Sequence, residues 1–154
     1  MNLQFISEDT PDGMYSTKQV GDKWMKIDHP KITRPEDVVL YFGDFFKRKR
    51  QEYFCTLNLN GSGEVISARI VTIGLLNHSL VHPREVFRDA IIDSAASIVC
   101  VHNHPSGGLE PSSQDIAITM QLKEAGGIIG ISIIDHIILV PDGGHVSMRE
   151  RGLV

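Results

Sequence analysis

One stretch of the chain, residues 97–115, constrains its fold and chemistry more than any other. It opens with SIVCV (97–101), a run of β-favouring residues, and continues as HNHPSGGLEPSSQD. On a strand, His102 and His104 project from the same face with Cα atoms about 6.6 Å apart, so both imidazoles can reach one ion. The prolines and glycines that follow must bend the chain before a helix begins. The sequence therefore predicts a strand, a loop and a helix that converge on a polar site.

Asp115 is a third candidate ligand, because it follows His104 by eleven residues and falls in the first turn of the predicted helix. Two histidines and one carboxylate around a divalent ion leave the fourth position to water, which is typical of catalytic zinc. The same letters have a simpler interpretation. Ser112-Ser113-Gln114-Asp115 also fits a helix capping box, and a first turn can hold a ligand while it caps the helix.

The spacing of His102, His104, Ser112 and Asp115 resembles the H-x-H-x7-S-x-x-D signature of the JAMM (MPN) metalloprotease superfamily. Further motifs, in the same order along the chain, resemble the RadC-like branch of that superfamily: VHPREVFRDAI (81–91), VCVHNHPSGG (99–108), PSSQD (111–115) and IIDHIILV (133–140). The resemblance implies an α/β fold of the layered α+β type, with a mixed β-sheet flanked by helices in one domain.

The resemblance also implies roles for the site residues. His102, His104 and Asp115 would bind Zn²⁺, and Ser112 would steady the oxyanion of the tetrahedral intermediate. Glu52 stands where JAMM proteins carry a glutamate that faces the metal-bound water, so it is the first candidate for the general base. Glu85, beside Arg84 in the second motif, is its rival, although a glutamate next to an arginine on a helix is more often an ion pair.

Asp135 and His136 interrupt the apolar run of the last motif. They are either a hydrogen-bonded pair inside the sheet or partners that orient a ligand histidine from behind. We favour such structural or supporting roles over direct ligation.

The remaining pattern predicts the elements around the site. Thr33-Arg34-Pro35-Glu36 fits a capping box that starts a helix at Pro35, and four consecutive basic residues, 47–50, end that helix. A contact between this cluster and an acidic partner or nucleic acid is an alternative to simple solvation. The further expected elements are a hairpin of strands 52–60 and 65–73, a turn over 74–79, a helix from Pro83, a helix from Ser112 or Ser113 to about Ala125 that Gly126-Gly127 ends, a central strand within 128–140, and a short strand or tail over 145–154.

The length of 154 residues fits one domain. We expect a loop-rich N-terminal extension over 1–34, with or without one short strand, and a RadC-like JAMM/MPN domain over 35–154. RadC-like proteins usually carry an N-terminal helix-hairpin-helix segment, and residues 1–34 are too few to hold one, which weakens the family argument for DNA binding.

These features predict a zinc-dependent hydrolase of amide or isopeptide bonds that acts on a peptide or protein. The alternative is a DNA-repair-associated binding module or a nuclease without peptidase activity. A net charge of −4 gives no overall basic surface for nucleic acid. The sequence shows no apolar stretch long enough to span a membrane, no signal peptide, and only two cysteines in strand-like runs. The expected location is therefore the cytoplasm.

Overall fold

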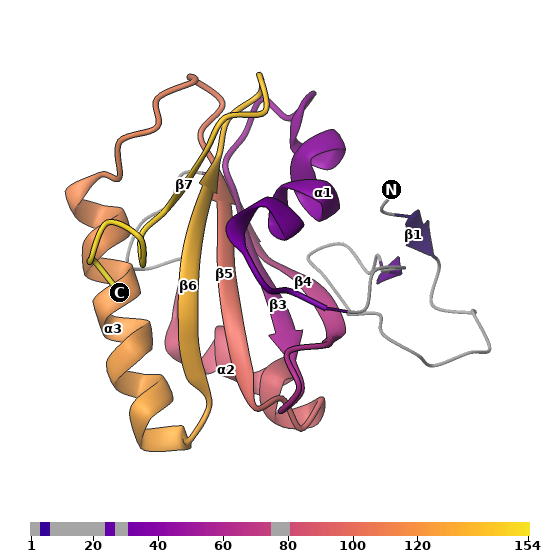
Figure 1. The fold of residues 1–154 in the computed structure, drawn as a ribbon, viewed down its shortest axis with the longest axis vertical. Coiled ribbons are helices and arrows are strands. Elements are labelled where there is room, and N and C mark those ends of the chain that lie inside the picture. Colours follow the sequence, from indigo (N-terminus) through magenta and orange to yellow (C-terminus); the bar gives the residue numbers. More distant parts are fainter. Residues whose placement is uncertain (1–3, 7–23, 27–30, 75–80) are drawn as a thin grey trace.

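The computed structural model describes residues 4–6, 24–26, 31–74 and 81–154, and a five-stranded mixed sheet organises it (Figure 1). The strand order is β4-β3-β5-β6-β7, with β5 and β6 parallel and the other neighbours antiparallel. The strands are β3 (Tyr53–Leu59), β4 (Val65–Ile73), β5 (Ser97–Asn103), β6 (Ser132–Leu139) and β7 (His145–Ser147). Two further strands, β1 (Gln4–Ile6) and β2 (Trp24–Lys26), pair with each other.

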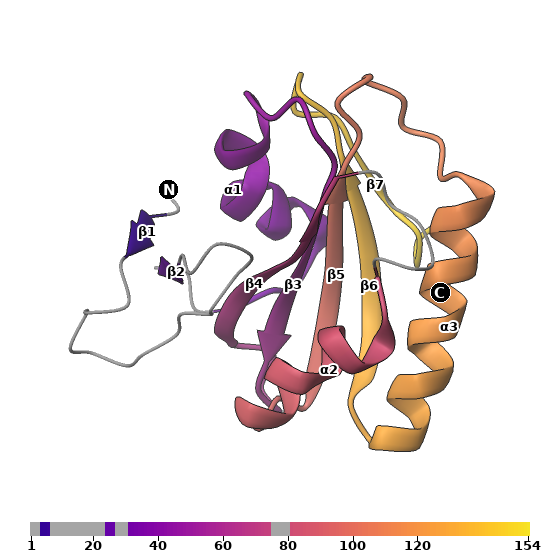
Figure 2. The same cartoon turned by 180° about the vertical axis from the view of Figure 1, so that it is seen from behind.

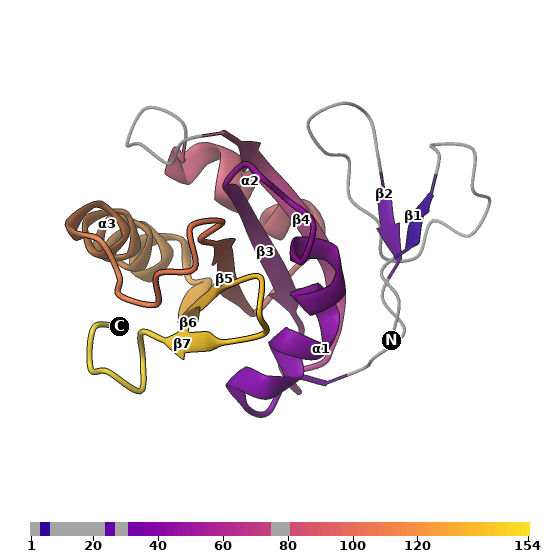
Figure 3. The same ribbon diagram turned by 90° about the horizontal axis from the view of Figure 1, so that it is seen from above.

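Helices cover both faces of the sheet. Helix α1 (Pro35–Phe46) lies on one face, and α2 (Pro83–Ile92) lies on the other, as the front and back views show (Figures 1 and 2). Helix α3 (Ser113–Ile129) packs beside β6 on the α2 side, opposite α1 in the view from above (Figure 3). The layered α+β fold predicted from the sequence is therefore confirmed.

Each face has its own apolar core, because side chains alternate along the strands. Val99 and Val101 of β5 pack against the phenylalanines of α1. Ile98 and Cys100 pack with α2 and α3, and His102 continues their alternation on that second face. Both cysteines are buried and free, as expected for reduced thiols. The core thus directs His102 towards α3, the helix that follows the loop.

Helix α1 begins at Pro35 as predicted, but the predicted capping carboxylate is wrong. The carboxylate of Asp37, not that of Glu36, accepts hydrogen bonds from the backbone N–H groups of Thr33 and Arg34, at 2.8 and 3.1 Å. The Thr33 hydroxyl also donates to it, at 2.8 Å. Glu36 remains exposed and makes only long contacts, with Arg34 at 4.0 Å and with His145 at 3.9 Å.

The end of α3 also corrects the sequence prediction. The helix passes through Gly126-Gly127 and ends at Ile129, where Gly130 adopts φ of 85°. A Cβ on Gly126 would lie 2.4 Å from the carbonyl oxygen of Ile131 and 3.1 Å from the Phe87 ring. Gly126 is therefore needed for close packing rather than for termination.

The predicted strand over 128–140 consequently begins later, at Ser132. Its two faces are covered, by α1 and α3, as predicted. The middle position of the sheet, however, belongs to β5, with β7 on the outer side of β6.

Other expectations concern segments that the structure describes only in part. Most of the predicted extension, 1–34, and nearly all of the predicted turn over 74–79 lie outside the described residues. The hairpin from β3 to β4 and the short final strand β7 are present. Among the described helices, none has the length and apolar character that crossing a bilayer requires.

Candidate metal centre

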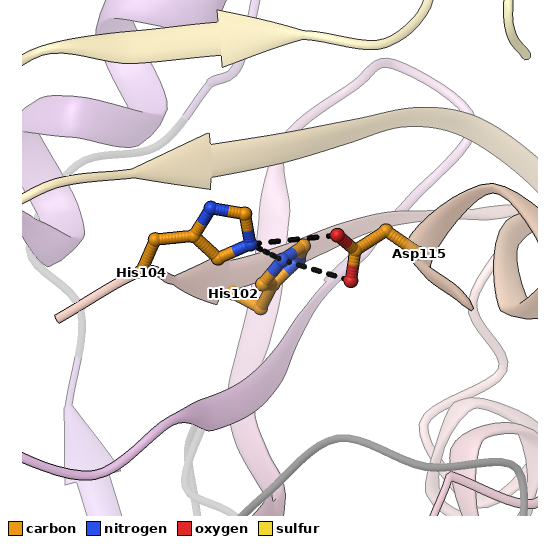
Figure 4. Close-up of side chains that lie close together, drawn as sticks. All are labelled: His102, His104 and Asp115. Atoms are coloured by element: carbon orange, nitrogen blue, oxygen red, sulfur yellow. Dashed lines mark hydrogen bonds and ion pairs between the residues drawn. The ribbon is translucent and has the colours of Figure 1, made fainter. Parts of the chain in front are cut away.

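Three predicted ligands meet at the end of β5 and the start of α3. Nε2 of His102 lies 2.8 Å from Nε2 of His104, and the Asp115 carboxylate approaches the two nitrogens to 3.2 and 3.4 Å (Figure 4). His102 and Asp115 are buried, and His104 is partly buried. His102 lies in β5, His104 directly follows the strand, and Asp115 lies in the first turn of α3. These three side chains form a group that can hold a metal ion.

The separation of these atoms fits a small divalent ion. Zinc binds histidine nitrogen and carboxylate oxygen at about 2.0–2.2 Å in tetrahedral geometry, which places neighbouring ligand atoms roughly 3.3 Å apart. The two nitrogens are 2.8 Å apart, Nε2 of His102 lies 3.2 Å from Oδ1 of Asp115, and Nε2 of His104 lies 3.4 Å from Oδ2, all near that value. Only small side-chain movements would be needed to surround an ion.

Each histidine is held so that Nε2 faces the shared point. Nδ1 of His104 lies 2.6 Å from the carbonyl oxygen of Gly108, and a carbonyl can only accept, so this nitrogen carries the proton. Nε2 of His104 then keeps a lone pair for a metal. Gly108, in the loop between strand and helix, was not among the residues singled out from the sequence, because a backbone acceptor carries no side-chain signal.

His102 is oriented from behind by His136, whose Nε2 lies 2.7 Å from Nδ1 of His102. Nδ1 of His136 in turn lies 2.5 Å from the hydroxyl of Thr119, which is 2.6 Å from the backbone carbonyl of Asp115. Thr119 sits one turn after Asp115 on α3 and is fully buried. Sequence reasoning did not single out Thr119, because a threonine on the buried face of a helix usually contributes only to packing.

Asp135 has the structural role considered for this pair, and His136 has the supporting role beside a ligand histidine. The Asp135 carboxylate accepts hydrogen bonds from the backbone of His136 and Arg149 and from the Ser147 hydroxyl, at 2.7, 3.0 and 2.6 Å. These contacts tie β6 to β7 and to the segment that follows β7. The side chain of His136 reaches the candidate ligand, whereas that of Asp135 fastens the edge of the sheet.

Electrostatics at the site favour neutral His102, neutral His136 and ionised Asp115. Burial lowers the pKa of His102 and holds the pKa of His136 well below its ordinary value. Burial would raise the pKa of Asp115, but hydrogen bonds from His102 and His104 outweigh it and keep that pKa well below the usual range. A hydrogen bond with Asp115 raises the pKa of His104, and burial opposes the increase.

Ser112 is the N-cap of α3, and its hydroxyl is engaged with Asp115. The hydroxyl donates to the carboxylate at 2.6 Å and accepts from the Asp115 backbone N–H at 3.1 Å. The carboxylate also accepts from the Ser112 backbone N–H at 2.7 Å. The capping box and the ligand position therefore coexist, as the sequence allowed.

Glu52 lies one residue before β3, and β3 is the strand that neighbours β5. Phe54 pairs with His102, so extending the antiparallel register by two residues brings Glu52 opposite His104. Its negative charge acts to raise the pKa of both ligand histidines, and it lines a hollow of about 320 Å³ together with Pro105 and Ser106. Glu85, its rival, instead forms ion pairs with Arg84 and Arg88 on the exposed side of α2.

Asn103 fixes the segment that carries Glu52. Its amide oxygen accepts from the Tyr53 backbone N–H at 2.7 Å, and its amide nitrogen donates to the Gln51 carbonyl at 3.0 Å. The backbone on both sides of Glu52 is thereby clamped to the residue between the two histidines. Residue-type reasoning missed this role, because it depends on which strand lies beside β5.

Comparisons with known proteins find relatives over most of the chain. A family model described as "RadC-like JAB domain" matches residues 32–153. A UPF0758 protein of Methanospirillum hungatei is 61% identical over 124 residues, covering 79% of this chain and 54% of that protein. UPF0758 proteins of Shouchella clausii and Methanosarcina mazei are 46% and 44% identical, covering 82% and 80% of this chain and 55% and 54% of their own lengths. The chain thus spans just over half the length of these relatives.

Proposed function

Because this chain belongs to the RadC-like JAB domain family, we propose that it is a zinc-dependent hydrolase of amide or isopeptide bonds in a peptide or protein. One observation carries the proposal. Two histidine nitrogens and one carboxylate converge from β5 and α3 with separations suited to a tetrahedral ion. Three protein ligands leave one position for water, as catalytic sites require.

A bound zinc ion would supply Lewis acidity, polarising the substrate carbonyl and lowering the pKa of a water. The residues of the chain would do the rest. Glu52, clamped by Asn103 and opposite His104, would accept a proton from the attacking water. It would then return that proton to the amine that leaves, the usual exchange of base and acid roles.

Ser112 has a defined part in this scheme. Its hydroxyl proton is directed at the Asp115 carboxylate, which keeps that ligand turned towards the histidines. Stabilising the oxyanion, the role implied by the resemblance, would require the hydroxyl to turn from Asp115 to the substrate. That role stays a prediction, as do the alternatives of a DNA-repair-associated binding module or nuclease.

Metal content and hydrolysis, measured on the same variants, test the proposal. We expect purified protein to hold one zinc by elemental analysis and His104→Ala to lose it. Glu52→Gln should keep the zinc and lose cleavage of an unstructured peptide mixture and of a lysine isopeptide-linked peptide, followed by mass spectrometry. Full zinc in His104→Ala would contradict the proposed ligands. Undiminished cleavage by Glu52→Gln would exclude Glu52 as the base.

Glu85→Gln is the matched control for Glu52→Gln. It removes a carboxylate from an exposed ion-pair cluster on α2, so both zinc content and cleavage should remain near wild type. Loss of cleavage in Glu85→Gln alone would transfer the role of general base to that residue.

A further inference from the structure

A large basic hollow lies next to the candidate metal centre. It has a volume of about 700 Å³ and is lined by Pro105, Ser106, Pro141 and the four consecutive basic residues 47–50. The basic residues follow the last turn of α1, while Pro105 and Ser106 directly follow His104. The fold therefore brings together two segments more than fifty residues apart in the sequence.

Three of these cations are exposed and unpaired within the part of the chain that the structure describes. Lys47, Arg48 and Arg50 are exposed and form no ion pair with any described residue. Lys49 is used differently, because its ammonium lies over the rings of Phe45 and Tyr53, at 4.6 and 5.3 Å from their centres. The hollow thus presents an unbalanced positive charge held at a fixed place, beside a helix end anchored in the core.

This hollow adjoins a smaller one that Glu52 lines. The smaller hollow that contains Glu52 and Gly74 shares Arg50, Pro105 and Ser106 with the larger one. A chain extending from the metal centre past Pro105 would therefore pass Arg50 and then reach Lys47 and Arg48. The positive charge lies on one side of the candidate centre rather than around it.

We propose that this hollow binds acidic side chains of the peptide substrate on one side of the bond to be cleaved. The inference rests on the proposed function and adds the substrate class. Arginine and lysine bind carboxylates by charge-assisted hydrogen bonds, and arginine does so in a bidentate manner. Two or three acidic residues, placed next to the cleaved amide, would match the cations that are available.

An acidic peptide fits these observations better than a nucleic acid. Strong binding to a phosphate backbone needs many cations over a long surface, and here they are confined to one segment. The chain as a whole carries −4 with these four cations included, so the surface outside the hollow is more acidic still. A short acidic segment would contact the hollow alone, whereas a long polyanion would also meet the repelling surface.

Binding of labelled peptides tests the inference without relying on cleavage. The probe is a fluorescein-labelled peptide with a run of glutamates at one end and Gly-Ser residues at the other. The matched peptide has glutamines in place of the glutamates, and anisotropy is measured at low salt with the full chain. We expect the acidic peptide to bind more tightly than the neutral one. Lys47→Glu/Arg48→Glu should weaken that binding about tenfold, the size expected for two reversed surface charges.

The control changes the net charge equally at a distance from the hollow. Arg84→Glu/Lys123→Glu places two reversals on exposed positions of α2 and α3, and it should shift the affinity by less than about twofold. Equal binding of the acidic and neutral peptides would overturn the inference. So would equal losses in the two double variants. A single-stranded oligonucleotide that binds more tightly than the acidic peptide, and is lost in Lys47→Glu/Arg48→Glu, would assign the hollow to nucleic acid instead.

Failure of this inference can be distinguished from failure of the proposed function. The His104→Ala variant should still bind the acidic peptide, because the hollow does not depend on the metal ligands. If the acidic peptide binds but the zinc-loaded protein cleaves no peptide, the hollow would still be a binding site for acidic peptides, and the proposed hydrolase activity would be wrong. If neutral and acidic peptides are cleaved with equal KM, the hydrolase activity would be supported, and the proposed binding of acidic side chains in the hollow would be wrong.

Discussion

The hydroxyl of Thr119 lies 2.5 Å from Nδ1 of His136. This contact links the candidate ligands His102 and Asp115, because His136 contacts His102 and Thr119 contacts the Asp115 backbone carbonyl. If His102 binds a metal through Nε2, its proton is on Nδ1 and is donated to Nε2 of His136. The remaining proton of His136 then points to Thr119, whose own proton goes to the Asp115 backbone carbonyl. Every donor in this buried series has an acceptor, so a single set of tautomers satisfies both ligand positions.

Thr119→Val should weaken zinc binding, because Nδ1 of His136 would face a methyl group and the orientation of His102 would loosen. Loss of such a supporting hydrogen bond typically reduces metal affinity about 10- to 100-fold. Competition with a chelator of known affinity measures the change. Thr119→Ser, which keeps the hydroxyl, should bind zinc nearly as the wild type does. Equal affinity in the valine and serine variants would show that the hydroxyl does not support the site.

Asn103→Ala should lower hydrolysis while zinc remains bound, because the amide that holds both sides of Glu52 would be removed. Asn60→Ala is a suitable control: its side chain accepts from the backbone N–H groups of Ser62 and Glu64 in the β3–β4 turn. Each variant should lose about 1–3 kcal/mol of stability at most. Only Asn103→Ala should reduce kcat per bound zinc, and equal reductions in both would assign the effect to stability alone.

Gly126→Ala should destabilise the protein, whereas its neighbour Gly127→Ala should not. A Cβ at Gly126 would lie 2.4 Å from the Ile131 carbonyl oxygen, while a Cβ at Gly127 would have nothing within 4 Å. We expect a loss of about 1–3 kcal/mol at Gly126 from overpacking and a gain of about 0.5–1 kcal/mol at Gly127 from helix propensity. Urea unfolding measures both. Similar stabilities for the two variants would mean that α3 can move away from β6.

Asp37→Asn should reduce stability near neutral pH by about 0.5–2 kcal/mol, the usual contribution of a capping side chain. Burial acts to raise the pKa of Asp37, but hydrogen bonds from Thr33 and Arg34 outweigh it and lower that pKa in the folded state. The stabilisation is therefore fully present above the unfolded pKa, about 3.9, and is lost as the pH falls through the lower folded pKa.

The difference in unfolding free energy between wild type and Asp37→Asn should accordingly shrink in acid. Glu36→Gln serves as the control, since Glu36 is exposed and its contacts with Arg34 and His145 are long, at 4.0 and 3.9 Å. A larger effect at Glu36 than at Asp37 would restore the capping box first predicted from the sequence.

Much of the fold could be predicted from the sequence, because strand alternation and helix periodicity are properties of neighbouring residues. The two-residue spacing of His102 and His104 was enough to place both imidazoles on one face. Pro35 and Pro83 marked two helix starts correctly. By contrast, Gly126-Gly127 resembles a helix end in isolation, and only the contact with Ile131 and Phe87 explains why the helix continues.

The sequence alone was enough to predict the candidate ligands and the order of the elements, since these depend on residue type and local spacing. Tertiary structure decided which groups support them. Thr119 and Asn103 take their roles from the elements packed beside them, and the basic residues 47–50 acquire a role only where α1 ends next to Pro105. Local geometry is fixed by the backbone of a few residues, whereas contacts between distant segments depend on how the helices and the sheet pack together.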